Sequence, residues 1–326
     1  MRHSKSALTG KKLFSTGLLH AFSRHLGSRV ALLGVVASLS PAFAQYGGRP
    51  GDVIIYMVSA KGSPDFRVVP DSTVNTKTGF VIEDPNDLPK EQFGPDFPAE
   101  SRRKMHAEAG DVFNVITQLE NDSSPHQQLL ETVKVFVAGG VLRLKPADQP
   151  PIDITAGLFV PFPKTIDFGP NEAMIQSMFL MWTPAPFFPA TTKAPDDYRS
   201  PNIPSQFPHG INYLIATGTF DTLVPWVPLR TVYPGNGWQQ GIDTRVIEID
   251  DQYGTKIQML RLRPGKATPT FRISANTHLF VLSGQVTITP ASGTASVMKK
   301  NIYAFVPPDF AIRLSNPAEY QGPVSH

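Results

Sequence analysis

Few side chains in this sequence can bind a metal ion or transfer a proton at neutral pH. The chain has no cysteine and only eight histidines, so thiolate nucleophiles, disulfides and zinc–thiolate sites are excluded. One short stretch brings together an imidazole, an amide and a carboxylate, at His126, Gln128 and Glu131. Nitrogen and oxygen donors of this kind suit Mn, Fe, Ni or Cu. The alternative is that His126 only anchors a loop or lies at the surface.

No familiar catalytic motif accompanies this stretch. The sequence lacks a G-x-S-x-G elbow, an H-E-x-x-H pair and a glycine-rich phosphate loop before a helix. Asp250 and Asp251, which are followed by Gly254, indicate a turn between strands rather than a calcium loop, because the alternating acidic positions are missing. Whether the protein is an enzyme stays open at this point.

The first 44 residues have the features of a secretory signal peptide. They contain Lys and Arg but no acidic side chain, then an apolar run over 30–37, and they end in Ala42-Phe43-Ala44. The apolar run is shorter than the ~20 residues that a membrane-spanning helix needs. We therefore expect residues 1–44 to be removed and the protein to be periplasmic or extracellular, with no membrane span after cleavage.

Charge and proline content narrow the class of protein further. The leader contains six of the 30 basic residues, so its removal changes the net charge from +3 to −3. Binding of nucleic acid through a basic surface is therefore not expected. Proline accounts for 32 of 326 residues, about twice its usual share of ~5%. Because proline is poorly tolerated inside helices, this content favours a loop-rich β-protein.

Short β-branched and aromatic runs, separated by Pro, Gly and Asp, predict an all-β sandwich or barrel. Residues 98–109 are the best helix candidate, with Gly110 as the stop signal. Residues 183–209 contain seven prolines and predict either a connector or a loop that covers a binding mouth. The expected strands are 53–58, 112–119, 133–137, 141–144, 158–161, 246–249, 257–262, 279–282, 286–289 and 302–306.

The chain repeats itself weakly when it is shifted by 144 residues, a shift that places Gly110 on Gly254 and Gly140 on Gly284. The strand runs between these glycines coincide as well. Identity is low, but glycines, prolines and strands recur in the same order. We infer two copies of one β-module.

The second copy resembles the cupin family, whose members are small double-stranded β-helix or jelly-roll barrels. Pro269 and Gly284 match the ends of the first cupin motif, and Pro307 and Asn316 match the ends of the second. The resemblance covers roughly 110–170 and 250–320. It implies an all-β bicupin with two such barrels, and a homodimer is a further implication because cupins commonly pair through sheet edges.

The resemblance divides the chain into four expected segments. These are a signal peptide at 1–44, an N-terminal cupin-like domain at 45–182, a proline-rich connector with leading strands at 183–240, and a C-terminal cupin domain at 241–326.

Catalytic cupins hold a divalent metal with three imidazoles and one carboxylate, and the resemblance assigns these positions in each copy. One histidine remains among the eight positions, so both metal centres are expected to be lost and no cofactor is expected. His278 follows one such position, and strand alternation turns it toward another sheet or a domain interface. The eight positions are His126, Gln128, Val133 and Ile166 in the first copy and Thr270, Arg272, Thr277 and Ile312 in the second.

Three functions are compatible with these residues. The first is an exported, non-metal bicupin that binds a small molecule or a partner, with His126, Gln128, Glu131, Thr270, Arg272 and Thr277 as candidate ligand-binding residues. The second is a metal-dependent dioxygenase or decarboxylase that uses His126 and Glu131. The third is a metal-free isomerase or lyase with a His or Tyr as general acid or base.

Overall fold

The computed structural model describes residues 46–62, 65–92, 97, 102–129, 131–145, 151–162, 167–184, 190–191, 214–215, 224–234 and 237–318. The expected signal peptide and most of the expected connector at 183–240 lie outside these residues. Among the described residues, no helix is long and apolar enough to cross a membrane.

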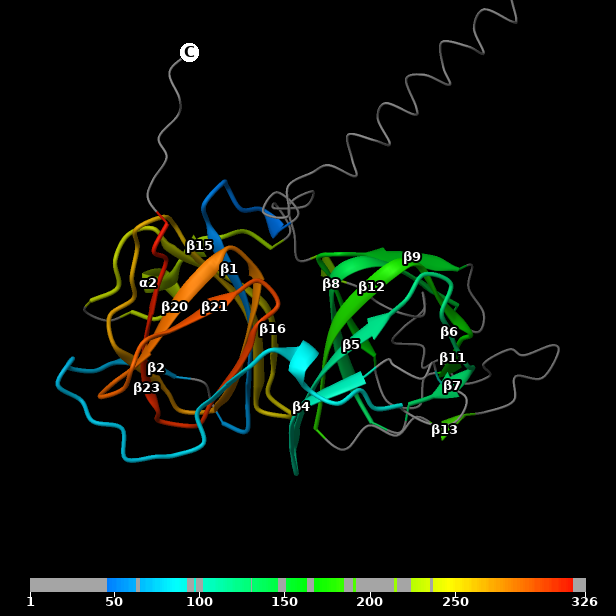
Figure 1. The fold of residues 1–326 in the computed structure, drawn as a ribbon, viewed down its shortest axis with the longest axis horizontal. Helices are drawn as coiled ribbons and strands as arrows, with labels where there is room; N and C mark the ends of the chain where they lie inside the picture. Colours follow the sequence, from blue (N-terminus) through cyan, green and yellow to red (C-terminus); the bar gives the residue numbers. More distant parts are fainter. Residues whose placement is uncertain are drawn as a thin grey trace, which may run out of the picture. The chain divides into compact units, whose positions relative to one another are not determined.

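The first barrel is formed by strands β4 to β14 (Figure 1, green). Its larger sheet has the order β14-β10-β8-β12-β5-β4, with β6 beside β12 and β9 beside β8, and a smaller sheet has the order β11-β7-β13. The strands are β4 (Arg102–Glu108), β5 (Asp111–Gln118), β6 (Ser123–Ser124), β7 (Gln127–Gln128), β8 (Val133–Leu144), β9 (Ile152–Thr155), β10 (Leu158–Phe162), β11 (Asp167–Phe168), β12 (Asn171–Thr183), β13 (Ala190–Thr191) and β14 (Leu214–Ile215).

The second barrel contains the three N-terminal strands as well as the C-terminal ones. Its sheets have the orders β15-β16-β17-β1-β19-β22-β3 and β2-β18-β23-β20-β21. The elements are β1 (Val53–Ala60), β2 (Phe66–Val68), β3 (Val81–Glu83), the 3-10 turn η2 (Pro85–Asp87), β15 (Val227–Pro228), α2 (Leu229–Val232), β16 (Ile242–Asp250), β17 (Thr255–Leu262), β18 (Phe271–Ile273), β19 (Asn276–Ser283), β20 (Gln285–Pro290), β21 (Ser296–Lys299), β22 (Tyr303–Val306) and β23 (Ala311–Ser315).

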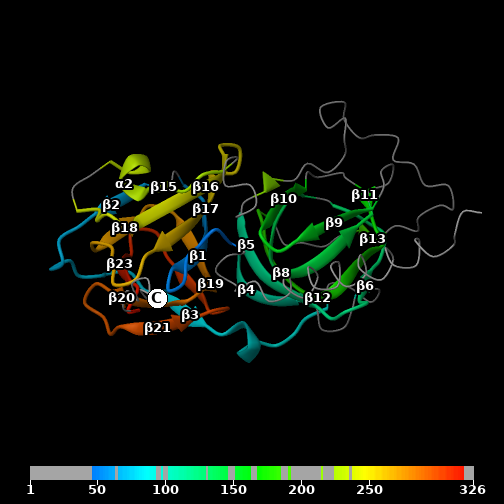
Figure 2. The ribbon, with the colours of Figure 1, turned by 90° about the horizontal axis from the view of Figure 1, so that it is seen from above.

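Strand β1 lies in the middle of a sheet of the second barrel. It pairs antiparallel with both β17 and β19, and Figure 2 shows it, in blue, among yellow and orange strands. Strands β2 and β3 join the same barrel through β18 and β22. Residues 53–83, which the sequence predicts to be part of an N-terminal domain at 45–182, therefore complete the C-terminal barrel, because their fully buried strand β1 fills the gap between β17 and β19.

The helix expected at 98–109 is wrong for the described part of that range, because residues 102–108 form β4. Glu108 pairs with Asp111 across the two-residue turn Ala109-Gly110, and Gly110 has a φ of +83°. A glycine with positive φ at this position is typical of a tight hairpin. Pairing with β5 thus outweighs the helix propensity of Ala, Arg and Lys.

The repeat predicted from the sequence is present in the structure. Strands β5 and β17 start and end at positions that differ by the same shift of 144 residues. Gly140 and Gly284 both have a positive φ, +81° and +77°, and a Cβ at either position would collide with neighbouring main chain. Both copies therefore need glycine at the same bend.

The described residues from 46 onward belong to one compact unit with three apolar clusters. One cluster fills the second barrel, one lines the first barrel, and the third lies between the barrels. Between them, Phe113, Phe136 and Trp182 of the first barrel pack with Tyr56 and Met259 of the second. The barrels therefore share a core instead of being joined only by the connector.

Candidate functional site

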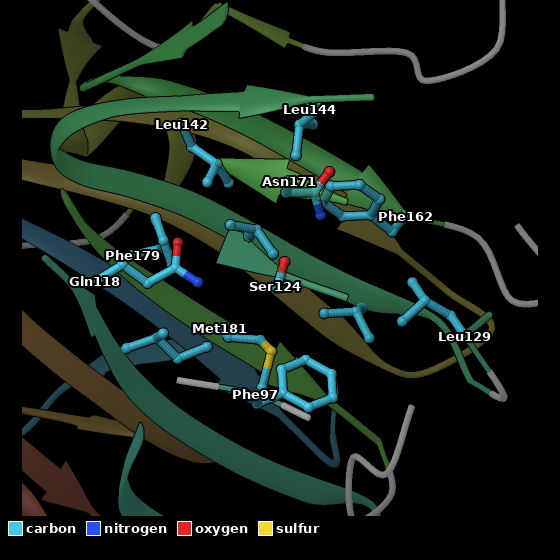
Figure 3. Close-up of a pocket in the computed structure, with 13 residues that line it drawn as sticks. Phe97, Gln118, Ser124, Leu129, Leu142, Leu144, Phe162, Asn171, Phe179 and Met181 are labelled. Atoms are coloured by element: carbon cyan, nitrogen blue, oxygen red, sulfur yellow. The ribbon is translucent and has the colours of Figure 1, made fainter. Parts of the chain in front are cut away.

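A cavity of about 80 Å³ opens inside the first barrel. Its walls are mainly apolar, and Figure 3 shows Leu142, Leu144 and Phe162 on one side with Met181 and Phe97 on the other. The volume is below the ~300 Å³ at which sites for drug-sized ligands begin, so the cavity suits a small molecule.

Three polar side chains face this apolar space, from three different strands. They are Gln118 on β5, Ser124 on β6 and Asn171 on β12. The Asn171 Oδ1 accepts a hydrogen bond of 3.2 Å from the Lys145 backbone N–H, whereas the buried Gln118 Oε1 has no hydrogen-bond partner among the described residues. A buried acceptor without a partner costs about 1 to 3 kcal/mol, and a ligand that donates a hydrogen bond would remove that cost.

Two further unpaired polar side chains lie on the interior face of the first barrel. Asn114 alternates along β5 with Phe113 and Val115, which face the second barrel, so its side chain faces inward. Both polar atoms of the Asn114 amide lack a partner among the described residues, as does the Thr183 hydroxyl on β12. The interior of the first barrel is therefore mainly apolar, and it contains buried polar atoms that lack hydrogen-bond partners among the described residues.

The described interior of the second barrel holds a packed apolar cluster, and its Gln258 side chain is hydrogen-bonded. Gln258 stands where Asn114 stands in the first copy. The Gln258 Oε1 accepts from the Tyr233 hydroxyl at 3.1 Å and the Thr244 hydroxyl at 3.4 Å, and its Nε2 contacts the Met57 sulfur. The described side chains inside the second barrel therefore form a packed core.

The structure shifts the expected metal-ligand register of the second copy by one residue. Phe271 and Ile273, not Thr270 and Arg272, face the barrel core. Arg272 lies on the opposite face of β18, beside Arg67 of β2, and the Thr270 hydroxyl donates to Asp71 Oδ1 at 2.5 Å. The spacing between the inward-facing Ile273 and Thr277 is therefore one residue shorter than the spacing that the resemblance implies.

The residues at the cupin metal positions do not fit a metal ion. In the second barrel these positions are Phe271, Ile273, Thr277 and Ile312, all buried. The Thr277 hydroxyl is hydrogen-bonded to Ser59 and to the Ala275 carbonyl, each at 3.1 Å. Aromatic and aliphatic side chains offer no donor atom.

The same shift in the first copy puts Leu129 in place of Gln128, and Leu129 and Val133 line the cavity with apolar groups. Ile166 and the side chain of Gln128 lie outside the described residues.

His126 and Glu131 do not join a metal-ligating cluster among the described residues. His126 is buried at 7% exposure and Glu131 is half-buried, and neither is among the described residues that line the cavity. His278 lies at the barrel interface, as alternation predicted, with its Nε2 2.8 Å from Asp111 Oδ1 of the first barrel.

Several solved structures are similar to this chain at low sequence identity. A proposed dioxygenase from Nostoc punctiforme PCC 73102 is similar over 77% of this chain and 83% of its own, at 14% identity and a TM-score of 0.53. A cupin 2 conserved barrel domain protein from Leptotrichia buccalis matches 76% of this chain and 88% of its own, at 8% identity and a TM-score of 0.39. The chain has the cupin fold.

Two barrels in one chain make it a bicupin fold. A deletion mutant of oxalate decarboxylase from Bacillus subtilis matches 76% of this chain and 76% of its own, at 11% identity and a TM-score of 0.48. No protein-family model and no curated protein matches the sequence. At 14% identity, the likeness to the structure from Nostoc punctiforme concerns the fold alone.

The cavity residues were not among the candidates taken from the sequence. Alternation along β5 could have identified Gln118 as a residue that faces the barrel interior, because Asn114, Ile116 and Gln118 share one face of the strand. Ser124 and Asn171 reach the cavity because β6 pairs with β12. The sequence around the short strand β6 does not reveal this pairing. None of the described lining residues is ionisable, so these residues provide no general acid or base.

Proposed function

We propose that this bicupin is an exported protein that binds a small, mostly apolar molecule inside its first barrel and does not catalyse a metal-dependent reaction there. The observation that carries the proposal is the apolar cavity with the unpaired Gln118 Oε1 in its wall. Export rests on the basic, apolar and A-x-A features of residues 1–44.

The chemistry of the walls indicates the class of ligand. An acceptor without a partner selects a ligand with a hydroxyl or N–H donor. The apolar lining selects a ring or short hydrocarbon for the remainder, since each buried CH₂ contributes about 0.8 kcal/mol. Phenol has both features and few atoms, and benzene has the same ring without the donor.

Thermal unfolding of the purified protein with phenol or benzene tests the proposal. A ligand that binds only the folded state raises the midpoint, so both compounds should raise it. Phenol should bind about fivefold more tightly than benzene, which corresponds to one hydrogen bond of about 1 kcal/mol.

Gln118→Leu is the matched variant, because Leu262 stands at the equivalent position of the second barrel. We expect this variant to bind benzene and to lose the preference for phenol. The proposal fails when neither compound shifts the wild-type midpoint, or when the preference for phenol survives in Gln118→Leu.

The alternative is a metal-dependent dioxygenase or decarboxylase that uses His126 and Glu131. Two of the similar solved structures have these names. It requires that His126→Ala removes both metal uptake and activity. A metal content that is unchanged in His126→Ala would eliminate this alternative.

A further inference from the structure

Three potential metal ligands come together at the tip of the β4–β5 hairpin, outside both barrel interiors. His106 and Glu108 are alternate residues of β4, and Asp111 begins β5 opposite Glu108. His106 Nε2 is 3.9 Å from Glu108 Oε1 and 3.8 Å from Asp111 Oδ2. Among the described residues this is the one group of three such side chains whose ligand atoms all lie within 4.8 Å of one another.

The second barrel holds Asp111 in a fixed orientation. Asp111 Oδ1 accepts from the Trp182 Nε1 of its own barrel and from the His278 Nε2, each at 2.8 Å. His278 Nδ1 in turn is 2.8 Å from the Tyr303 hydroxyl. With Oδ1 occupied in this way, Oδ2 is the oxygen that faces His106. Such outer contacts orient ligands in metal sites.

His106 brings a nitrogen that no described residue uses. Its Nε2 is buried and lacks a hydrogen-bond partner among the described residues, while its ring stacks on Phe305 at 4.1 Å between centroids. Burial, followed by the proximity of His278, lowers the pKa of His106.

One N–H group bridges the two carboxylates, and one cation pairs with Glu108. Asn276 Nδ2 donates to Glu108 Oε1 and, at 2.9 Å, to Asp111 Oδ2. Lys61 Nζ is 3.0 Å from Glu108 Oε1 and its side chain is 40% exposed, so it can withdraw into solvent. Rotation of the Asn276 amide would present Oδ1 as a further oxygen ligand.

We propose that His106, Glu108 and Asp111 bind a divalent first-row transition-metal ion at the junction of the two barrels. One imidazole and two carboxylates form a mixed N/O set that suits Zn²⁺ or Mn²⁺. Tetrahedral zinc at about 2.0 to 2.1 Å holds its ligand atoms about 3.3 Å apart, so His106 Nε2 and each of the two carboxylate oxygens need to approach by about half an ångström. Glu108 is 43% exposed and can make this movement.

The ion would be structural, because its ligands belong to the first barrel and several of the residues around them belong to the second. Asn276 and His278 lie in the first half of β19, and Lys61 directly follows β1. Both strands belong to the second barrel. A cation here would neutralise Glu108 and Asp111 and strengthen the contact between the barrels.

Zinc titration of the untagged, EDTA-stripped full-length protein by calorimetry tests the site. We expect one saturable site per chain in the wild type. Glu108→Gln should weaken binding at least tenfold, because one charged ligand is lost, and His106→Gln should do the same. Zinc should raise the unfolding midpoint of the wild type and not that of Glu108→Gln.

Glu120→Gln is the matched control, since Glu120 is an exposed acid beyond the end of β5, and it should bind zinc like the wild type. Circular dichroism verifies that each variant is folded. No saturable binding by the wild type overturns the proposal. Unchanged binding by Glu108→Gln also overturns it, and loss of binding in His126→Ala with retention in Glu108→Gln would place the ion in the first barrel instead.

Discussion

The two barrels of this protein share one fold and differ in what fills them. Asn114 and Gln258 occupy equivalent positions, and only Gln258 has hydrogen-bond partners among the described residues. Gln118 borders a cavity, whereas its counterpart Leu262 is part of a packed core. After duplication of a module, one copy can thus become a solid support while the other keeps room for a ligand.

The outer faces of the barrels differ in a related way. Lys134 and His278 are equivalent positions on β8 and β19, and each contacts carboxylates of the other barrel. Lys134 Nζ is 2.5 Å from both Glu248 and Asp250 of the second barrel, and His278 reaches Asp111 of the first. Different polar contacts therefore join the barrels at the two related positions, a lysine with two carboxylates at one and a histidine with a single carboxylate at the other.

Truncation of equivalent core residues should reveal the largest difference in stability between the two barrels. Leu144 lines the cavity and Ile288 is its counterpart in the packed core. We expect Ile288→Ala to lower the free energy of unfolding by about 4 kcal/mol and Leu144→Ala by about 2 kcal/mol, because a side chain beside a cavity loses fewer contacts. Urea denaturation measures both values, and equal losses would contradict the distinction between a filled and an open barrel.

Replacement of the equivalent amides by leucine should have opposite effects. Gln258→Leu leaves the Tyr233 hydroxyl without its acceptor, and we expect a loss of about 2 kcal/mol. Asn114→Leu removes two buried polar atoms that lack partners among the described residues, and we expect a gain of up to about 1 kcal/mol. Urea midpoints at constant slope report these changes. Destabilisation by both variants would mean that Asn114 is paired inside the first barrel.

Acidification should weaken the contact between the barrels by a smaller amount. Burial alone would raise the pKa of Asp250, but the hydrogen bond and attraction of Lys134, with the backbone N–H groups of Tyr253 and Gln252, lower it. Because its folded pKa lies below the unfolded value of ~3.9, this contribution is present above pH ~4 and is lost as the pH falls through the folded pKa.

We expect that loss to stay below about 1 kcal/mol, since solvent screens a partly exposed pair. Unfolding followed from pH 6 to pH 2 should show a smaller pH dependence in Asp250→Asn than in the wild type. Asp251→Asn, which changes the exposed neighbouring acid, should behave like the wild type. Identical pH profiles for all three proteins would exclude a role for Asp250.

The sequence allowed the fold to be predicted because its signals are local and repeated. Apolar runs marked the main strands, and Gly140 and Gly284 marked the same bend in both copies. The face of β18 could not be predicted, because the segment before β19 can hold one residue more or fewer. That single residue decides whether Arg272 or Phe271 faces the core.

The candidate site was harder to predict because it depends on residues that are distant in the sequence. The cavity needs β6 to pair with β12, and the junction cluster needs Asp111 to meet His278, 167 residues away. His126 and Glu131 are candidates from the sequence because of their donor atoms and their closeness along the chain. Closeness in sequence does not determine which way a side chain points at the end of a short strand.

The position of β1 has a consequence for the order in which the chain can fold. Met57 pairs with Gln258, 201 residues later, so this apolar strand has no sheet to enter until β17 and β19 have been synthesised. Long-range pairing of this kind slows folding and leaves the strand exposed to wrong partners meanwhile. The first barrel can therefore assemble early, whereas the second barrel closes only when the two ends of the polypeptide meet.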